Sequence, residues 1–462
     1  MTGIGNDLRN AVRGRVVAMG EDGYEQARMA WNVAVRQQPV AVVEVADADD
    51  AAAVVRYAGR TGLAVSTQTT GHGASTAADG TILVKTRALR GVRVDAGERV
   101  ARIGAGMPWL DVLGATAEHG LTGAVGSSDV VGVAGYTLGG GVGWFARSHG
   151  FAANMVRSFE VITADGARTR VSADADPDLF WALRGGGGDF ALVTELELEL
   201  FEANSLSGGR MLWPSEQASA VLAAFRRATV EAPEGLSIWC TLIQFPPFPQ
   251  LPELLRGRAM IAVDLLAQGA VTSPLRWFDE VPGLVLDTRR PLLPTEIGSI
   301  CMEPTAPSPA RIRGELLTDL CPETSATLLD AVVPGGTPAP LALAQIRHLG
   351  GAIARPVADA GCAGQLPEPY LLSLLGPIPT PELAAVVTAR QDAVTTALRS
   401  QLSGRKPLTY LDSGDSAAAA FAPETLARLQ QIKDKYDPRS TFRAGFPVLA
   451  ADPAVTTIEH TA

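Results

Sequence analysis

The sequence predicts an α+β protein in two parts that meet near residue 204. Before that point, short runs of β-branched residues bounded by Gly or Asp alternate with stretches of helical spacing. Composition also changes there, because 30 of the 48 glycines but only three of the 31 prolines precede residue 204. A chain of 462 residues is long enough for two or three domains. We therefore place a domain boundary at residue 204.

The elements of the first part follow from local residue patterns. The residues between turn-forming Gly, Asp or Pro predict strands at 39–45, 80–85, 100–105 and 158–164. A helix is expected over 47–58, since its acidic start favours a helix N-terminus. Another is expected over 109–119, because Pro108 suits a helix start.

The second part combines long amphipathic helices with apolar strands between Pro-rich connections. Helices are predicted over 215–229, 381–402 and 423–435, and strands over 260–266 and 370–375. The pattern alone does not give the spatial order of these elements. The residues from Ala450 onward are polar and are expected to be mobile.

Composition excludes several classes of function. The net charge of -10 argues against a nucleic-acid or anionic-membrane partner. No apolar run reaches 18 residues and the first ten residues lack a signal-peptide pattern, so a cytoplasmic protein is expected. The cysteines and histidines lack metal-ligand spacing, so no metal site is predicted and the thiols are expected to be free: Cys240, Cys301, Cys321, Cys362, His119, His149 and His348. The oligomeric state does not follow from the sequence.

Two segments rich in glycine carry the functional signal. We call residues 68–75 (Gln-Thr-Thr-Gly-His-Gly-Ala-Ser) the histidine loop and residues 126–144 the glycine segment. Small residues in such loops let backbone N–H groups approach an anion such as a pyrophosphate. The Rossmann-like patterns at 101–106 and 141–146 are weaker evidence, because they lack a third small residue or the required strand–turn–helix context.

Six motifs in order resemble a known family. They are Thr70-Gly-His-Gly73, the strand-turn 94–106, the glycine run 132–143, Thr163-Ala-Asp-Gly166, residues 177–190 and Tyr436-Asp-Pro438. This set is similar to the FAD-binding domain of the vanillyl-alcohol-oxidase superfamily, in its berberine-bridge-enzyme-like branch. The resemblance implies a PCMH-type FAD-binding domain of two α+β subdomains over 1–204. It also implies an α/β substrate-binding domain with a large antiparallel sheet over 205–405 and a return of the chain to the FAD-binding domain over 406–462.

The resemblance implies that FAD is bonded to His72, which occupies the position of the family's flavin-linked histidine. A histidine that merely caps a loop is the alternative. Many relatives form a second link through a cysteine, but Ser128 stands at that position and residues 1–204 contain no cysteine, so attachment through His72 alone is expected. Thr69 and Thr70 replace glycines of the family motif, which suggests hydroxyls near the pyrophosphate. The predicted cofactor-binding residues are Gln68, Thr69, Thr70, Gly71, Gly73, Ala74, Ser127, Ser128, Gly132, Val133, Gly135, Leu138, Gly139, Gly140, Gly143 and Val193.

The resemblance also implies a catalytic tyrosine. Relatives place a Tyr-x-Asn motif against the flavin, and Thr409-Tyr-Leu-Asp412 matches it with Asp in place of Asn. Tyr410 is therefore the predicted base; a plain pocket-wall residue is the alternative for Tyr410, and Tyr370 is the alternative base. The expected function is that of an oxidoreductase, an oxidase that takes a hydride from a hydroxyl- or amine-bearing small molecule and passes it to O2. A cyclase or isomerase without net oxidation is the competing hypothesis.

Overall fold

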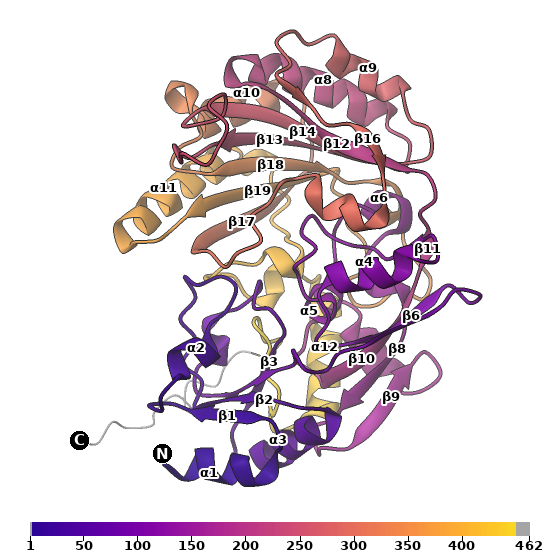
Figure 1. Cartoon of the computed structure of the whole chain (residues 1–462), viewed down its shortest axis with the longest axis vertical. Helices are drawn as coiled ribbons and strands as arrows, with labels where there is room; N and C mark the ends of the chain where they lie inside the picture. The colour runs from indigo at the N-terminus through magenta and orange to yellow at the C-terminus, as the bar shows by residue number, and fades with distance from the viewer. Residues whose placement is uncertain (1, 450–462) are drawn as a thin grey trace.

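The computed structural model describes residues 2–449 and shows two domains stacked along the long axis of the molecule (Figure 1). The N-terminal domain carries two separate sheets, and the second domain is built on one large sheet (Figure 1). Across the described part of the chain, the strands form sheets of four, five and eight strands and one two-stranded pair. The α+β fold with a large antiparallel sheet is confirmed.

The first sheet of the N-terminal domain has the strand order β1-β2-β4-β3. Its strands are β1 (Arg15–Ala18), β2 (Ala41–Glu44), β3 (Val65–Gln68) and β4 (Ile82–Lys85), and its helices are α1 (Thr2–Ala11), α2 (Tyr24–Arg28) and α3 (Ala48–Thr61). The Asp47 carboxylate caps α3 by accepting from the backbone N–H groups of Asp49 and Asp50. Helix α3 ends at Gly62, whose φ of 73° suits a helix C-terminus. The parallel pairing of β3 with β4 places the end of β3, where the histidine loop begins, at one edge of this sheet.

The second sheet of the N-terminal domain is antiparallel, with the order β5-β6-β10-β8-β9. Its strands are β5 (Val92–Asp95), β6 (Val100–Gly104), β8 (Val156–Ile162), β9 (Arg168–Ser172) and β10 (Leu192–Glu199). The helices and strands that follow in the chain around it are α4 (Trp109–Ala117), β7 (Leu121–Thr122), α5 (Val133–Leu138), α6 (Ala146–His149), α7 (Pro177–Leu183) and β11 (Phe201–Glu202). Short α5 and α6 lie in and after the glycine segment, between the two domains (Figure 1).

The second domain is an antiparallel sheet in the order β15-β12-β14-β13-β18-β19-β17, with β16 beside β12. Its strands are β12 (Leu206–Pro214), β13 (Leu236–Gln244), β14 (Ala259–Gln268), β15 (Leu286–Asp287), β16 (Arg290–Leu292), β17 (Ala310–Leu317), β18 (Leu343–His348) and β19 (Tyr370–Pro377). Its helices are α8 (Ala218–Glu231), α9 (Arg276–Asp279), α10 (Pro322–Val332) and α11 (Pro381–Ala397), which lie on one side of the sheet (Figure 1).

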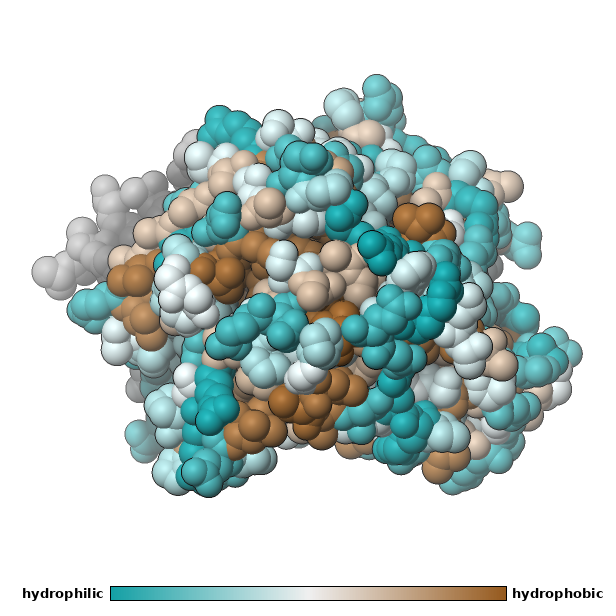
Figure 2. Space-filling view, turned by 90° about the horizontal axis from the view of Figure 1, so that it is seen from above, coloured by the Kyte–Doolittle hydropathy of each residue, from teal (hydrophilic) through white to brown (hydrophobic). Residues whose placement is uncertain are grey.

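The two faces of the large sheet differ, because side chains alternate along a strand. On β13, Ile238, Cys240 and Leu242 belong to the apolar core under the helices, while Trp239 and Thr241 face the N-terminal domain. Seen from the helix-covered end, apolar patches are separated by polar side chains (Figure 2). One face of this sheet is therefore covered by helices, and the other is turned toward the N-terminal domain (Figure 1).

The chain returns to the N-terminal domain at its end. Helix α12 (Pro423–Tyr436) packs against α7, and Val65 of β3 forms a parallel bridge with Phe442. The ammonium group of Lys433 is buried and donates to the Asp437 carboxylate at 2.8 Å and to the backbone carbonyl of Phe442 at 2.8 Å. These contacts make the last described residues a structural part of the first domain.

The predicted elements agree closely with the structure. Each predicted strand and helix is present, with ends displaced by a few residues. The helix expected to reach residue 402 instead ends at Ala397 and continues as one turn of 3₁₀-helix over Arg399–Gln401. The prediction of mobile residues from Ala450 falls outside the described residues. Within residues 2–449 no helix is long and apolar enough to cross a membrane, and no cluster of metal-ligating side chains was found.

Candidate functional site

The histidine loop turns sharply after β3. Gly71 has φ of +87°, and a side chain there would collide with Gln68 and Ala30, so only glycine fits this turn. At Gly73, in contrast, an added Cβ would meet nothing within 4 Å. The loop is thus packed against the protein at Gly71, while the space beside the backbone at Gly73 contains no protein atoms.

Three further backbone segments converge on this loop. A Cβ added to Gly132 would lie 3.0 Å from the Thr69 side chain, and the backbone N–H of Gly187 donates to the carbonyl of Leu138 at 2.9 Å. A Cβ added to Gly445 would lie 3.4 Å from the Gly73 carbonyl. The structure therefore brings together the histidine loop, the glycine segment, the 185–188 turn and the C-terminal return.

The remaining predicted residues of the glycine segment lie around α5. Gly132 precedes this helix, Val133 and Leu138 are buried in it, and Gly135 is exposed on it. A Cβ at Gly135 would meet nothing within 4 Å, whereas Gly139 lies against Thr409 and Gly143 against the Val125 carbonyl. The other predicted residues lie near these: Ala74 in the histidine loop, Ser127 and Ser128 before α5, Gly140 at φ +100°, and Val193 buried in β10.

The threonine hydroxyls of the histidine loop have protein partners. The Thr69 hydroxyl lies 2.9 Å from the Ala105 carbonyl oxygen and 2.8 Å from the Thr86 hydroxyl. The Thr70 hydroxyl lies 2.9 Å from Nδ1 of His72. In this structure the two hydroxyls hold the loop together and engage the histidine, while their predicted position near a pyrophosphate stays a prediction.

His72 is held from two sides. Its ring stacks on Trp31 with centroids 4.3 Å apart, and Thr70 engages Nδ1. Its Nε2 is buried and has no hydrogen-bond partner in residues 2–449. Burial lowers the pKa of His72 to about 4, so the imidazole is neutral near pH 7. The imidazole is therefore neutral and oriented, with one ring nitrogen available to a ligand.

Tyr410 lies where the large sheet meets the glycine segment. It belongs to a short 3₁₀ turn (Leu408–Tyr410), and its ring packs against Gly314 of β17, where an added Cβ would lie 2.6 Å from it. The same apolar cluster includes Val142 of the glycine segment and Leu316 of β17. Glycine at position 314 therefore creates the space in which the Tyr410 ring lies.

The charges around Tyr410 act in opposite directions. Loss of water around the hydroxyl raises the pKa of Tyr410; the nearby Arg347 guanidinium opposes this increase, while Glu303 adds to it. The Asp412 carboxylate is paired with Arg311 at 2.6 Å. A carboxylate two residues from Tyr410 would disfavour a phenolate there, and this ion pair offsets its charge.

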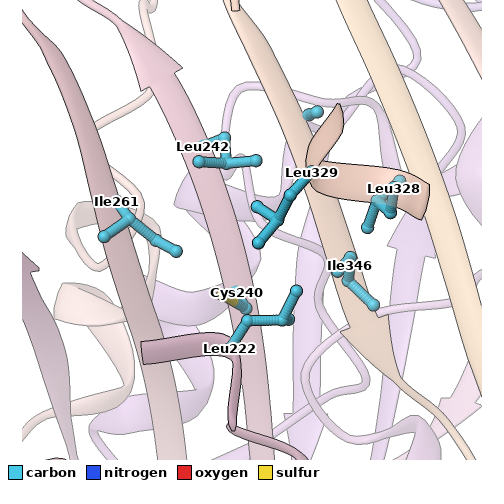
Figure 3. Close-up of a pocket in the computed structure, with 8 residues that line it drawn as sticks. Leu222, Cys240, Leu242, Ile261, Leu328, Leu329 and Ile346 are labelled. Atoms are coloured by element: carbon cyan, nitrogen blue, oxygen red, sulfur yellow. The ribbon is translucent and has the colours of Figure 1, made fainter. Parts of the chain in front are cut away.

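Tyr370, the alternative base, points away from this site. Its hydroxyl lies 2.9 Å from the Thr229 hydroxyl of α8, on the helix-covered side of the sheet. A small apolar cavity on that same side, with a volume of about 10 Å³, is lined by side chains from β13, β14, β18, α8 and α10 (Figure 3). It offers no polar group and is a packing gap between sheet and helices.

Sequence reasoning missed three residues of this region: Trp31, Tyr136 and Arg347. The Arg347 guanidinium lies 4.0 Å from the Trp239 ring centroid and 5.8 Å from that of Tyr410. Tyr136 is packed against Gly126, Gly141 and Gly143, and its buried hydroxyl has no partner among the described residues. The only local signal was that an Arg and two aromatic residues occur in otherwise apolar stretches, which does not single them out.

Comparison with known proteins adds the cofactor. A family model described as an FAD binding domain matches residues 39–172. The (R)-6-hydroxynicotine oxidase of Paenarthrobacter nicotinovorans is 32% identical over 206 residues, 44% of this chain and 45% of that protein. An FAD-dependent monooxygenase of Fusarium proliferatum is 36% identical over 219 residues, 46% of this chain and 42% of that protein. These alignments thus span less than half the length of either relative.

The similarity in structure extends over nearly the whole chain. The BBE-like 1 protein of Physcomitrella patens superposes with a TM-score of 0.82 at 17% identity, covering 96% of this chain and 98% of that one. At this level of identity the match establishes the fold.

The local geometry fits FAD. The glycines of four converging segments leave room for close approach of a dinucleotide to the backbone, and the unpartnered buried groups Gln68 Nε2, His72 Nε2 and the Tyr136 hydroxyl supply polar atoms there. Residues 39–172 thus belong to an FAD binding domain, in a chain whose whole fold is similar to that of the BBE-like 1 protein.

Proposed function

We propose that this protein is an FAD-dependent oxidase that removes a hydride from a carbon bearing a hydroxyl or amine group in a bulky small molecule, with O2 reoxidising the flavin. The observation that carries the proposal is the position of Tyr410, between the large sheet and the glycine segment and with the Arg347 guanidinium 5.8 Å from its ring centroid. The relatives described as an oxidase and a monooxygenase support redox chemistry.

In this proposal FAD, when bound, accepts the hydride, and a side chain of the protein removes the proton. The Tyr410 phenolate takes the proton of the substrate hydroxyl or amine at its Oη. Arg347 stabilises the phenolate, because a cation near the ring lowers the pKa of Tyr410 against the effect of burial. The sheet and the glycine segment around Tyr410 exclude water from the reacting groups.

We further propose that the flavin is bonded covalently to His72 alone. The neutral ring, its free Nε2 and its fixation by Trp31 and Thr70 support this assignment. A covalent bond fixes the flavin ring and makes it a stronger oxidant, which suits an enzyme that passes electrons to O2. Every cysteine of the chain lies beyond residue 204, so a second thioether link has no candidate in the FAD-binding domain.

Acid precipitation tests the attachment. The yellow colour of the wild-type protein is expected to stay with the pellet, and His72→Ala is expected to release flavin or yield apoprotein. Ser128→Ala is the matched control, since it changes the position of the missing cysteine and should leave the pellet yellow. Free flavin in the wild-type supernatant refutes covalent attachment.

Peroxide production tests the reaction class. With a panel of alcohols and amines, an oxidase forms one H2O2 for each product oxidised by two electrons. A product at the oxidation level of its substrate, formed without peroxide, assigns the protein instead to the cyclases or isomerases.

A further inference from the structure

Arg347 carries a buried charge with only neutral partners. Its side chain lies on β18, on the face turned toward the N-terminal domain, and the residue is 8% exposed. Nε donates to Oε1 of Gln345 at 2.6 Å, and Nη2 makes a long contact of 3.4 Å with the Ser127 hydroxyl. In residues 2–449 no hydrogen bond from Nη1 and no ion pair of Arg347 is present. Such a burial is costly unless a counter-charge joins it.

Three other buried cations of the molecule, Arg210, Lys433 and Arg147, have protein partners. Arg210 makes a bidentate pair with Asp264 at 2.6 and 2.9 Å. Lys433 is paired with Asp437. Arg147 has no carboxylate, but its Nε, Nη1 and Nη2 donate to backbone carbonyls, among them that of Leu236 at 2.8 Å. Arg347 differs from all three, since one nitrogen of its guanidinium is left for a ligand.

The guanidinium is held in a fixed orientation at the junction of the domains. It lies against the face of Trp239, which is itself stacked on Trp144 of the glycine segment at 3.6 Å. Gln345, which accepts from Arg347, donates in turn to the Thr241 hydroxyl at 3.1 Å. These contacts fix the plane of the guanidinium before any ligand arrives, which favours recognition of a planar anion through two parallel hydrogen bonds.

Resting on the proposed oxidase function, we propose that the substrate carries a carboxylate and that Arg347 binds this carboxylate beside Tyr410. An anionic ligand is the counter-charge that the buried guanidinium lacks. Arg347 would thus determine substrate specificity and place the oxidised carbon close to the Tyr410 hydroxyl.

Calorimetric titration of the holoenzyme tests this inference without knowledge of the substrate. The probes are acetate, hexanoate and benzoate, each compared with its amide, which has nearly the same shape and no charge. At least one carboxylate is expected to bind tenfold or more tightly than its amide in the wild type, and Arg347→Gln is expected to abolish this preference. Arg347→Lys should retain part of it, because a lysine keeps the charge but loses the planar fork.

The matched control is Arg313→Gln, on the opposite face of the same sheet, where Arg313 is paired with Glu315 and Asp392. This variant should bind the carboxylates as the wild type does. The inference is overturned if no carboxylate is preferred by the wild type, or if Arg347→Gln keeps the preference.

Sulfite binding tests whether Arg347 acts on a substrate carboxylate or on the flavin. Sulfite adds to the flavin ring, and a positive charge near the ring increases its affinity. Arg347→Gln is expected to leave sulfite affinity within threefold of wild type. A tenfold loss with unchanged carboxylate preference would assign Arg347 to the flavin and overturn the proposal. A colourless protein would refute the proposed flavin function without refuting the carboxylate site. The calorimetric comparison of carboxylates with amides would still test Arg347 in that case.

Discussion

The residues that matter most here are polar groups that the protein leaves without partners. His72 and Tyr410 were predicted from sequence because each stands inside a short motif. Arg347 was not, since its meaning depends on Ser127, 220 positions earlier, and on the face of β18 that it occupies. A local sequence pattern can indicate which side chain takes part in a reaction. It does not indicate which buried charge has no counter-ion, because that depends on residues far away in the sequence.

Replacing Tyr410 by Phe is expected to lower the rate of substrate oxidation about 10²- to 10⁴-fold, the usual size of the loss of a general base. Binding should change little, because only a hydroxyl is removed. The wild-type rate should also rise with pH at the alkaline end, since burial raises the pKa of Tyr410 and the base must be deprotonated. Stopped-flow measurement of flavin reduction checks both expectations.

Tyr370→Phe is the matched control for that experiment, because the Tyr370 hydroxyl contacts Thr229 on the far side of the sheet. It should retain the wild-type rate. A Tyr410→Phe enzyme as fast as the wild type would make Tyr410 a pocket-wall residue.

His348 is expected to make the folded state sensitive to acid. Burial, together with Arg147, lowers the pKa of His348 to about 2. The unfolded chain, with a pKa near 6.5, takes up the proton first, so stability is complete above pH 6.5 and is lost as pH falls toward 2. The loss is at most about 1.4 kcal/mol per pH unit for one proton.

Urea unfolding at several pH values between 7.5 and 5 measures this effect, and His348→Gln isolates it from the carboxylates. Glutamine can still accept the Arg147 hydrogen bond. If wild type and variant lose stability in parallel, His348 does not contribute to the acid sensitivity.

At the level of elements, the sequence predicted where strands and helices lie but not how the strands pair. β-Branched runs and caps are local, and they matched β2, β4, β6 and α3 to within a few residues. The order of the large sheet depends instead on contacts between distant segments, such as the pairing of β17 with β19. The match of Gly314 with the Tyr410 ring is a consequence of that pairing and has no sequence signature.

Gly314→Ala is expected to reduce activity strongly while the flavin is retained. The new Cβ would lie 2.6 Å from Tyr410 Cβ and Cδ1, so the ring or the strand must move. A displacement near 1 Å at a reacting group is enough for a loss of about 10²-fold. Flavin absorbance and turnover, measured on the same sample, separate the two effects.

Gly114→Ala in α4 serves as the control, because an added Cβ there would meet nothing within 4 Å. This change should leave turnover as it is and raise stability slightly, since alanine favours a helix over glycine. Full activity in Gly314→Ala would show that the ring has room to adjust.

At the level of the whole molecule, the C-terminal return is fixed to the N-terminal domain by a buried ion pair and by backbone contacts. Lys433→Met is expected to destabilise the protein by about 3–5 kcal/mol, because it leaves the buried Asp437 carboxylate without its partner. Lys435→Met, two residues along the same helix, removes an exposed lysine paired with Asp178 and should destabilise the protein far less, because water screens the pair. Urea unfolding of the two variants, with flavin retention measured alongside, checks the difference; equal losses would mean that the buried pair contributes nothing special.

The domain plan was predicted from composition and from the resemblance, since glycine-rich motifs and a change in proline content are visible along the chain. The contacts that join the two domains could not be predicted from the sequence. Trp144 and Trp239 stack face to face at 3.6 Å, yet they lie in segments that share no pattern. Packing between domains depends on shape in three dimensions, and a sequence records that shape only indirectly.

The pairing of β3 with the end of the chain also bears on biosynthesis. The Ser66 hydroxyl donates to the carbonyl of Arg443, 377 residues later. While the ribosome is still elongating the chain, the first domain therefore lacks the segment that completes the edge beside the histidine loop. This edge of the first domain stays incomplete until the entire second domain has been synthesised. Completion of this sheet edge is accordingly an event that follows synthesis of the second domain.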